Sequence, residues 1–172
     1  MQEEDDILAE LTARFPYLQG KMRMQRARRL YVEVPADKFM EVFLHLHKNM
    51  KFIMLTTITG QDLGANLAAM YHLARTSGVL LNLLVAVPRE NPVLQSITSY
   101  FPAADAYERE LIDLLGMKVE GLPPGSRYPL PDGWPEGQYP LRKDWSEEKM
   151  NATVAASAAA QLSPNPAKES KP

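Results

Sequence analysis

Three stretches of the chain repeat apolar residues every three or four positions, which is the spacing of an amphipathic helix. The first lies within residues 1–20, where a proline and a glycine follow the last apolar position and are expected to end the helix. The second covers residues 37–50, and Asp37 is expected to cap its N-terminus. The third covers residues 106–115, just before a glycine. The pattern therefore predicts three helices separated by long stretches of another kind.

Those other stretches have the alternating or continuous apolar pattern of β-strands. Residues 21–34 alternate charged and apolar side chains and are expected to form a strand, a turn and a second strand. Residues 52–59 are rich in β-branched side chains and stop at Gly60. Residues 65–75 fit a strand or an alanine-rich helix; we expect a strand, because a short connection leads to the buried strand at 79–87. The order of elements predicts an α+β fold, a mainly antiparallel sheet with helices packed on it.

The pattern changes after residue 116. Six prolines and four glycines interrupt the next stretch, and this density excludes a helix or a central strand. Large aromatic residues lie between the prolines, which is unusual for a disordered linker. We therefore divide the chain into four parts: an N-terminal helix (1–20), an α+β core domain (21–116), an extended proline-rich C-terminal arm (117–145) and a flexible tail (146–172).

Composition excludes several classes of protein. The 172 residues carry a formal net charge of −2, which gives no long-range attraction to nucleic acid or to an acidic membrane. The chain has no cysteine, so it holds no cysteine-ligated iron–sulfur cluster, no disulfide and no cysteine nucleophile. No apolar run approaches the roughly 20 residues of a membrane-spanning helix, and the acidic first residues do not resemble a signal or transit peptide. We expect a cytoplasmic location.

The residue patterns that carry catalysis or cofactor binding are missing. His45 and His47 lie about 160° apart around the predicted helix and His72 is isolated, so we predict no metal site. The glycines form neither a phosphate-binding nor a dinucleotide-binding pattern, and no serine lies in a nucleophile elbow. We therefore predict no catalytic, cofactor-binding or metal-binding residue in this chain.

Basic residues are concentrated in the predicted hairpin over residues 21–29, at Lys21, Arg23, Arg26, Arg28 and Arg29. This concentration makes an RNA-binding module the alternative function of another class. The hairpin lacks interleaved aromatic residues, and the chain is slightly acidic overall. We interpret the basic side chains as a solvated hairpin face or as the rim of a contact with a partner protein.

Glu108 lies inside the apolar arc of the helix predicted at 106–115, where a lone carboxylate is costly to bury. Asp105 and Glu108 have the spacing of a capping box, and Gly116 lies where a left-handed C-terminal cap belongs. We interpret these three residues as structural caps. A buried ion pair between Glu108 and an arginine, or a catalytic acid or base, are the alternatives.

Two separated motifs resemble the 30-kDa subunit family of respiratory complex I, which also contains the equivalent subunits of membrane-bound, energy-converting nickel–iron hydrogenases. The first motif is FPAADAYERELIDLLGMKVEG (101–121), an acidic–Arg–acidic helix that ends in a glycine. The second is LPDGWPEGQYPLRKDW (130–145). Between them, Leu122 replaces a histidine that is common in the family, and only Arg127 remains of a pair of arginines. These departures favour a hydrogenase-type or otherwise divergent complex.

The resemblance implies a non-catalytic structural or assembly subunit of a complex-I-like, membrane-associated oxidoreductase. Such a subunit holds no cofactor. It packs against a large subunit with a quinone site or a nickel–iron centre, beside subunits with iron–sulfur clusters. It lies peripherally on the inner face of the cell membrane, contacts the membrane arm only indirectly, and binds no nucleic acid or small-molecule substrate. The hydrogenase type is favoured, and an NADH:quinone oxidoreductase is the alternative.

Proline stiffens the arm, so ordering it costs less chain entropy, and its aromatic residues are typical interface anchors. We therefore predict that the arm wraps a partner subunit; the alternative is that it folds back onto its own sheet. The expected partner-binding residues are charged residues of the helix at 106–115 and charged or aromatic residues of the arm: Arg109, Glu110, Asp113, Arg127, Tyr128, Trp134, Tyr139, Arg142, Lys143 and Trp145.

Overall fold

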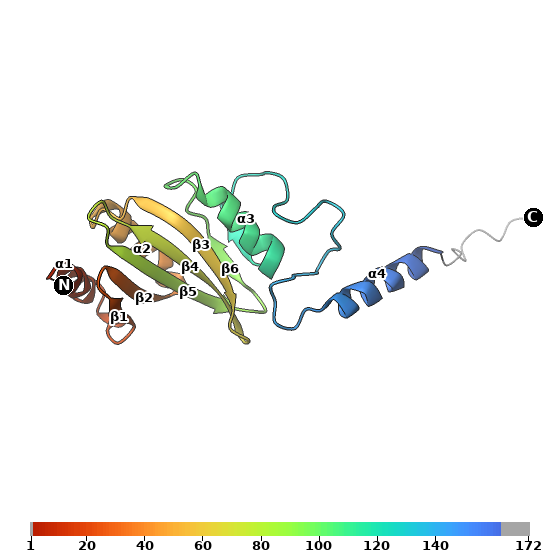
Figure 1. Cartoon of the computed structure of the whole chain (residues 1–172), viewed down its shortest axis with the longest axis horizontal. Coiled ribbons are helices and arrows are strands. Elements are labelled where there is room, and N and C mark those ends of the chain that lie inside the picture. Colours follow the sequence, from red (N-terminus) through yellow and green to blue (C-terminus); the bar gives the residue numbers. More distant parts are fainter. Residues whose placement is uncertain (1, 163–172) are drawn as a thin grey trace, which may run out of the picture.

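The computed structural model describes residues 2–162, and side chains as far as residue 155. Figure 1 shows a twisted sheet with helices packed on it and a final helix that extends away from the body. The helices are α1 (Gln2–Arg14), α2 (Phe39–Lys48), α3 (Ala104–Leu115) and α4 (Glu147–Leu162), with 3-10 turns η1 (Pro16–Leu18) and η2 (Ala36–Lys38). The strands are β1 (Met22–Arg26), β2 (Arg29–Pro35), β3 (Met54–Asp62), β4 (Asn66–Ala74), β5 (Leu80–Pro88), β6 (Val93–Gln95) and β7 (Lys118–Glu120).

The main sheet has the strand order β1-β2-β5-β4-β3. All neighbouring strands in it are antiparallel except β2 and β5, which are parallel because α2 and the β3–β4 hairpin lie between them in the chain. Strands β6 and β7 form a separate parallel pair. The predicted α+β class with a mainly antiparallel sheet is confirmed, and the parallel pair makes the sheet a mixed one.

The two faces of the sheet differ in polarity. Tyr71 and Leu83 are register partners that lie in the hydrophobic core, whereas the next pair, His72 and Asn82, lies on the opposite face. The ring of Phe39, the first residue of α2, lies 4.7 Å from the ring of Tyr71. The apolar side chains of α2 therefore cover the face of the sheet on which Tyr71 lies, as the alternating pattern of a half-buried strand requires.

Gly60 brings α3 close to the sheet. A Cβ atom at this position would overlap the side chains of Leu111 and Leu115, so the helix rests directly on the glycine. The sequence predicted that β3 ends at Gly60, but the strand continues to Asp62. The glycine serves close packing rather than strand termination, because it is the one residue type that leaves room for α3.

The beginnings of two helices, α2 and α3, depart from the prediction. Helix α2 follows the turn η2, and Asp37 lies inside that turn and forms no side-chain cap. Helix α3 begins at Ala104, two residues before the predicted start. Of the predicted flexible tail, 146–172, residues Glu147–Leu162 form α4, and residues 163–172 lie outside the described part of the chain.

Candidate functional site

The predicted arm, residues 117–145, begins with β7 and then runs without helix or strand from residue 121 to residue 146. It loops along α3 and leads into α4, which extends away from the sheet (Figure 1). The backbone N–H and C=O groups of such a segment have no partners in a helix or sheet, so those that are buried need hydrogen bonds from other parts of the chain. Four sets of contacts do so.

Arg109 of α3 makes the first set. Its guanidinium forms two hydrogen bonds with the carboxylate of Asp105, both of 2.9 Å, and Nη2 also donates to the carbonyl oxygen of Pro123 at 2.8 Å. Gly125 allows this approach, because a Cβ there would overlap the guanidinium. The same arginine lowers the pKa of Asp105. Asp105 therefore positions Arg109 against the arm and does not cap the helix, which has Ala103 at its N-cap without a side-chain bond.

Asp113 makes the second set from the middle of α3. Its side chain is 8% exposed, and Oδ1 accepts a 2.9 Å hydrogen bond from Nε of Arg127. Oδ2 accepts a 3.1 Å bond from the main-chain N–H of Leu130. Nη1 of Arg127 in turn donates to the carbonyl oxygen of Trp134 at 3.0 Å. One carboxylate thus holds two points of the arm and shapes the turn between them.

The C-terminal end of α3 makes the third set. Gly116 has the left-handed conformation of a C-terminal cap, with φ of 69°. Two orphan carbonyl oxygens of the last turn accept hydrogen bonds from the arm: Leu114 from the N–H of Leu141 at 3.0 Å, and Leu115 from Nε of Arg142 at 2.7 Å. A Cβ on Gly116 would lie 2.5 Å from the ring of Tyr139. The glycine is needed both for its backbone conformation and for the closeness of the arm.

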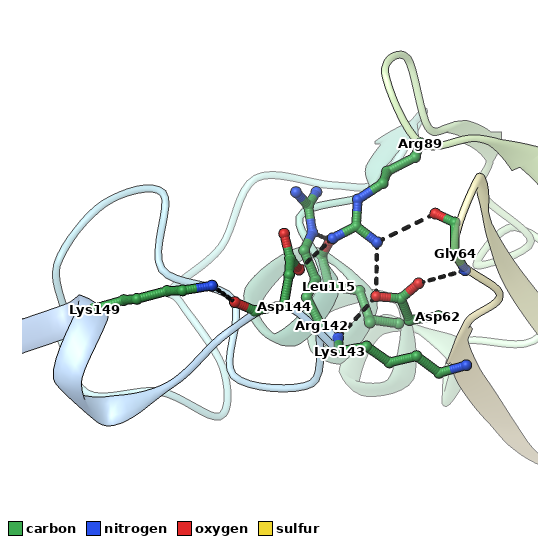
Figure 2. Close-up of polar contacts among 8 residues, drawn as sticks. All are labelled: Asp62, Gly64, Arg89, Leu115, Arg142, Lys143, Asp144 and Lys149. Atoms are coloured by element: carbon green, nitrogen blue, oxygen red, sulfur yellow. Dashed lines mark hydrogen bonds and ion pairs between the residues drawn. The ribbon is translucent and has the colours of Figure 1, made fainter.

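Asp62, at the end of β3, makes the fourth set (Figure 2). Its carboxylate accepts hydrogen bonds from the N–H of Gly64 at 2.8 Å, from Nη1 of Arg89 at 2.7 Å and from the N–H of Lys143 at 2.9 Å. Nη2 of Arg89 also pairs with the carboxylate of Asp144. The last part of the arm is therefore fastened to the β3–β4 hairpin through one arginine and two aspartates.

These bonds change the acidity of the two aspartates. The N–H of Lys143, with help from Gly64 and Arg89, lowers the pKa of Asp62 to about 2. A hydrogen bond from its own backbone N–H, and then Arg89, lower the pKa of Asp144. Both side chains are therefore ionised at neutral pH, and their contacts with Arg89 join opposite charges.

The aromatic residues of the arm pack largely on each other. The rings of Trp134 and Trp145 stack with centroids 6.2 Å apart, and Nε1 of Trp134 donates to the carbonyl oxygen of Gln138 at 2.8 Å. The guanidinium of Arg142 lies 4.3 Å from the centre of the Tyr139 ring. Tyr128 is 47% exposed and so remains open to solvent.

Glu108 is fully buried and forms neither the predicted capping box nor an ion pair with an arginine. Oε1 accepts a 2.8 Å hydrogen bond from the N–H of Ile97, and Oε2 accepts a 2.7 Å bond from Oγ of Ser96. Burial is the main cause that raises the pKa of Glu108. The carboxylate therefore ties α3 to the segment that follows β6. The apolar arc indicated its burial, but not its partners.

The predicted partner-binding residues thus fall into two groups. Those with side chains engaged inside the chain are Arg109, Asp113, Arg127, Trp134, Tyr139, Arg142 and Trp145. Glu110 makes no hydrogen bond or ion pair with any residue that the structure describes, and Tyr128 and Lys143 are exposed. Sequence analysis missed Asp62 and Arg89; the only local signal was the Asp-x-Gly turn between β3 and β4.

The remaining candidate features lie away from the arm or are engaged elsewhere. Nε2 of His45 lies 3.0 Å from Oε1 of Glu10, and Arg23 of the basic hairpin stacks 3.9 Å above the ring of Tyr31. The hairpin forms the edge of the sheet opposite β3. Within the described residues no three histidine, aspartate or glutamate side chains are grouped to hold a metal ion, and no helix is long and apolar enough to cross a membrane.

Comparison with known proteins agrees with the resemblance of the two motifs. The family model described as the 30 Kd subunit of respiratory-chain NADH dehydrogenase matches residues 32–151. The membrane-bound hydrogenase subunit beta of Pyrococcus furiosus is 28% identical over 150 residues, 84% of this chain and 87% of that protein. One component of the F(420)H(2) dehydrogenase of Methanosarcina mazei is 32% identical over 142 residues, 81% of this chain and 89% of that protein.

A solved structure agrees as well. One chain of the membrane-bound sulfane sulfur reductase, an archaeal respiratory membrane complex, has a TM-score of 0.73 with this fold at 25% identity. The similarity covers 98% of this chain and 97% of that one, so it includes the arm. The chain therefore belongs to the family of the 30 Kd subunit of respiratory-chain NADH dehydrogenase.

Proposed function

We propose that the chain is a non-catalytic structural subunit of a complex-I-like, membrane-associated oxidoreductase, and that its arm docks on the large subunit of that complex. One observation carries the proposal: the arm is held on its own core at four places, yet it exposes 47% of Tyr128 and 55% of Leu141. Large apolar side chains on a firmly held loop are typical interface anchors.

The arrangement gives each side of the arm a separate role. The inner side is used by the chain itself, through the carboxylates of Asp113 and Asp62. The outer side carries Tyr128, Leu141 and the amino group of Lys143. Because the arm is already ordered, docking does not have to supply the whole entropy of ordering it. The two alternatives drawn from the sequence are therefore compatible: the inner side of the arm folds back onto the core, and we propose that the outer side contacts the partner.

For the type of complex we propose an energy-converting hydrogenase. Its support is the similarity to a membrane-bound hydrogenase subunit beta and the replacement of the family's usual histidine by Leu122. The large subunit would then hold the nickel–iron centre, neighbouring subunits the iron–sulfur clusters, and this chain no cofactor, on the inner face of the membrane. A quinone-reducing complex is the alternative outcome. The RNA-binding alternative for residues 21–29 gains no support from the family match, and we do not propose it.

Purification of the tagged full-length chain from the membranes of its source tests the proposal. The wild-type chain is expected to bring down a large subunit, and cysteine ligands for nickel in that subunit identify a hydrogenase. A double variant, Tyr128→Ser with Leu141→Ser, is expected to lose most of the large subunit while its unfolding temperature stays unchanged. Ile53→Ser with Met54→Ser, at two equally exposed positions at the start of β3, is the matched control. Equal recovery with both double variants contradicts docking through the arm.

A further inference from the structure

A polar pocket lies where the arm passes into α4. Its volume is about 280 Å³, and its lining includes Tyr139, Arg142, Asp144, Trp145 and Lys149. Residues on both sides of the junction contribute to it, so its shape depends on how α4 leaves the arm. The pocket is separate from the contacts of Arg109 and Asp113 described above.

Trp145, which lines the pocket, has an indole N–H without an acceptor within the described residues. Nε1 of Trp145 is buried and has no hydrogen-bond partner within the described residues. The stacked Trp134 differs, because its Nε1 donates to Gln138. Burying an N–H group without a hydrogen-bond acceptor costs free energy, and such groups are rare in native proteins unless they have a functional role.

The two basic side chains that line the pocket, Arg142 and Lys149, also have N–H groups without an acceptor within the described residues. Arg142 uses only Nε within the described residues, so its two terminal nitrogens have no hydrogen-bond partner there (Figure 2). Lys149 donates to the carbonyl oxygen of Asp144 at 2.5 Å and forms no direct ion pair within the described residues, although its charge helps to lower the pKa of the Asp144 carboxyl. The carboxylate of Asp144 is paired with Arg89, and the acidic residues that open α4, Glu147 and Glu148, do not line the pocket.

The pocket can open, because α4 is weakly held. The described side chains from residue 151 to residue 155 are all exposed, and the helix extends away from the sheet and α3 (Figure 1). The Lys149–Asp144 contact crosses the junction between the arm and the helix. A rotation of α4 about this junction would change the shape of the pocket and leave the anchors on Asp62 and Asp113 in place.

We infer that this pocket receives a side-chain carboxylate, from aspartate or glutamate, of the large subunit on which the arm docks. The inference rests on the proposed function and names the chemistry of one contact within it. The guanidinium of Arg142 has the planar fork that matches a carboxylate, the indole of Trp145 supplies a third donor, and Lys149 adds charge. Docking would then fix the direction of α4, because the acceptor bridges the arm and the helix.

The first test uses acetate as the probe. The chain has two tryptophans, so the ¹⁵N spectrum of the full-length protein contains two indole N–H signals. At constant ionic strength, increasing acetate is expected to shift the Trp145 signal progressively and to leave the Trp134 signal in place. An unmoved Trp145 signal overturns the inference, and so does a response to phosphate without one to acetate.

The second test measures assembly in the source organism. Trp145→Phe removes the indole N–H together with part of the ring that stacks on Trp134, and it is expected to weaken binding of the large subunit at least about tenfold, the effect of losing one hydrogen bond to a charged group. The isolated chain is expected to keep its unfolding temperature. Tyr71→Phe is the control and is expected to leave assembly unchanged, because it removes a hydroxyl in the core that is likewise buried without a hydrogen-bond partner within the described residues.

Lys149→Gln provides a second variant that keeps the indole stack intact. It is expected to weaken assembly in a salt-dependent manner. If Tyr128→Ser with Leu141→Ser loses the large subunit while Trp145→Phe and Lys149→Gln retain it, this inference fails and the proposed docking stands. If none of these variants loses the large subunit, the proposed docking itself fails.

Discussion

The main-chain N–H of Lys143 donates a 2.9 Å hydrogen bond to Oδ2 of Asp62, a residue 81 positions earlier in the chain. The arm is therefore not a loose extension of α3. Its last turn is bound to Asp62 at the end of β3, whereas earlier parts of the arm are bound to α3, through Arg127 on Asp113 and through Leu141 on Leu114. This contact between the end of the arm and β3, which we call the closure, holds the exposed side chains of the arm in fixed positions.

Replacement of Asp62 by asparagine tests the closure. The amide keeps one acceptor oxygen but presents an NH₂ group where Lys143 and Arg89 now donate. We expect the free energy of unfolding to fall by about 1–3 kcal/mol, and trypsin to cut within residues 117–145 sooner than in the wild type. Asp132→Asn is the control, because Asp132 is exposed and makes no hydrogen bond within the described residues. Similar protease sensitivity of the two variants would show that the closure contributes little.

Acid should loosen the same contact. The pKa of Asp62 is lowered to about 2 from a usual value of 3.8, so between these values the folded chain binds fewer protons at this group than the unfolded chain. The stability from Asp62 is therefore complete above about pH 4 and lost as the pH falls towards 2. Both tryptophans lie in the arm, so their fluorescence should report the loss directly. Asp62→Asn should lack this component, and an unchanged acid profile in that variant argues against Asp62 as the titrating group.

Gly116→Ala tests the closeness of the arm to the end of α3. The residue has φ of 69°, which costs about 1–2 kcal/mol for a residue with a Cβ, and that Cβ would also meet the Tyr139 ring. We expect a loss of about 2–4 kcal/mol in thermal unfolding, together with weaker protection of the arm from proteolysis. Gly133→Ala is the control in the same arm, because nothing lies within 4 Å of its added methyl group. An equal loss of stability in Gly133→Ala would contradict the view that the conformation of Gly116 and its closeness to Tyr139 cause the loss.

Two substitutions of Glu108 separate hydrogen bonding from charge. Glu108→Gln keeps an acceptor for the N–H of Ile97 and is expected to change the free energy of unfolding by less than about 1 kcal/mol. Glu108→Leu leaves the N–H of Ile97 without its acceptor and takes one acceptor from the hydroxyl of Ser96, which keeps its contacts with Thr98, and it should cost about 2–4 kcal/mol in urea unfolding. Equal costs would indicate that the negative charge itself stabilises the fold.

The pH dependence of stability, compared between the wild type and Glu108→Gln, is an independent test of the burial of Glu108. Burial raises the pKa of Glu108, so the folded chain binds more protons at this group than the unfolded chain above the usual value of 4.5. The stability of the wild type should therefore rise relative to Glu108→Gln as the pH falls through the raised pKa. Parallel stability curves for the two proteins would show that Glu108 titrates normally.

The sequence by itself determined the class of fold. Apolar periodicity identified the helices α1, α2 and α3 and the main strands, and proline density identified the stretch without helix or strand after β7, because both signals act over a few neighbouring residues. It also placed Glu108 on the apolar arc of its helix, where the structure buries it. The choice between helix and strand for residues 65–75 was decided correctly from the short connection to the next strand, and β4 covers Asn66–Ala74.

Only the tertiary structure decided which groups meet. Asp105 turned out to position Arg109 instead of capping α3, Glu108 binds the segment after β6, and Gly60 admits α3 instead of ending β3. The partner of Lys143 lies 81 residues away, and no local pattern specifies such a pair. The physical reason is that spacing determines the face on which a side chain lies, whereas its partner depends on how distant elements pack, and that packing is set by the whole core.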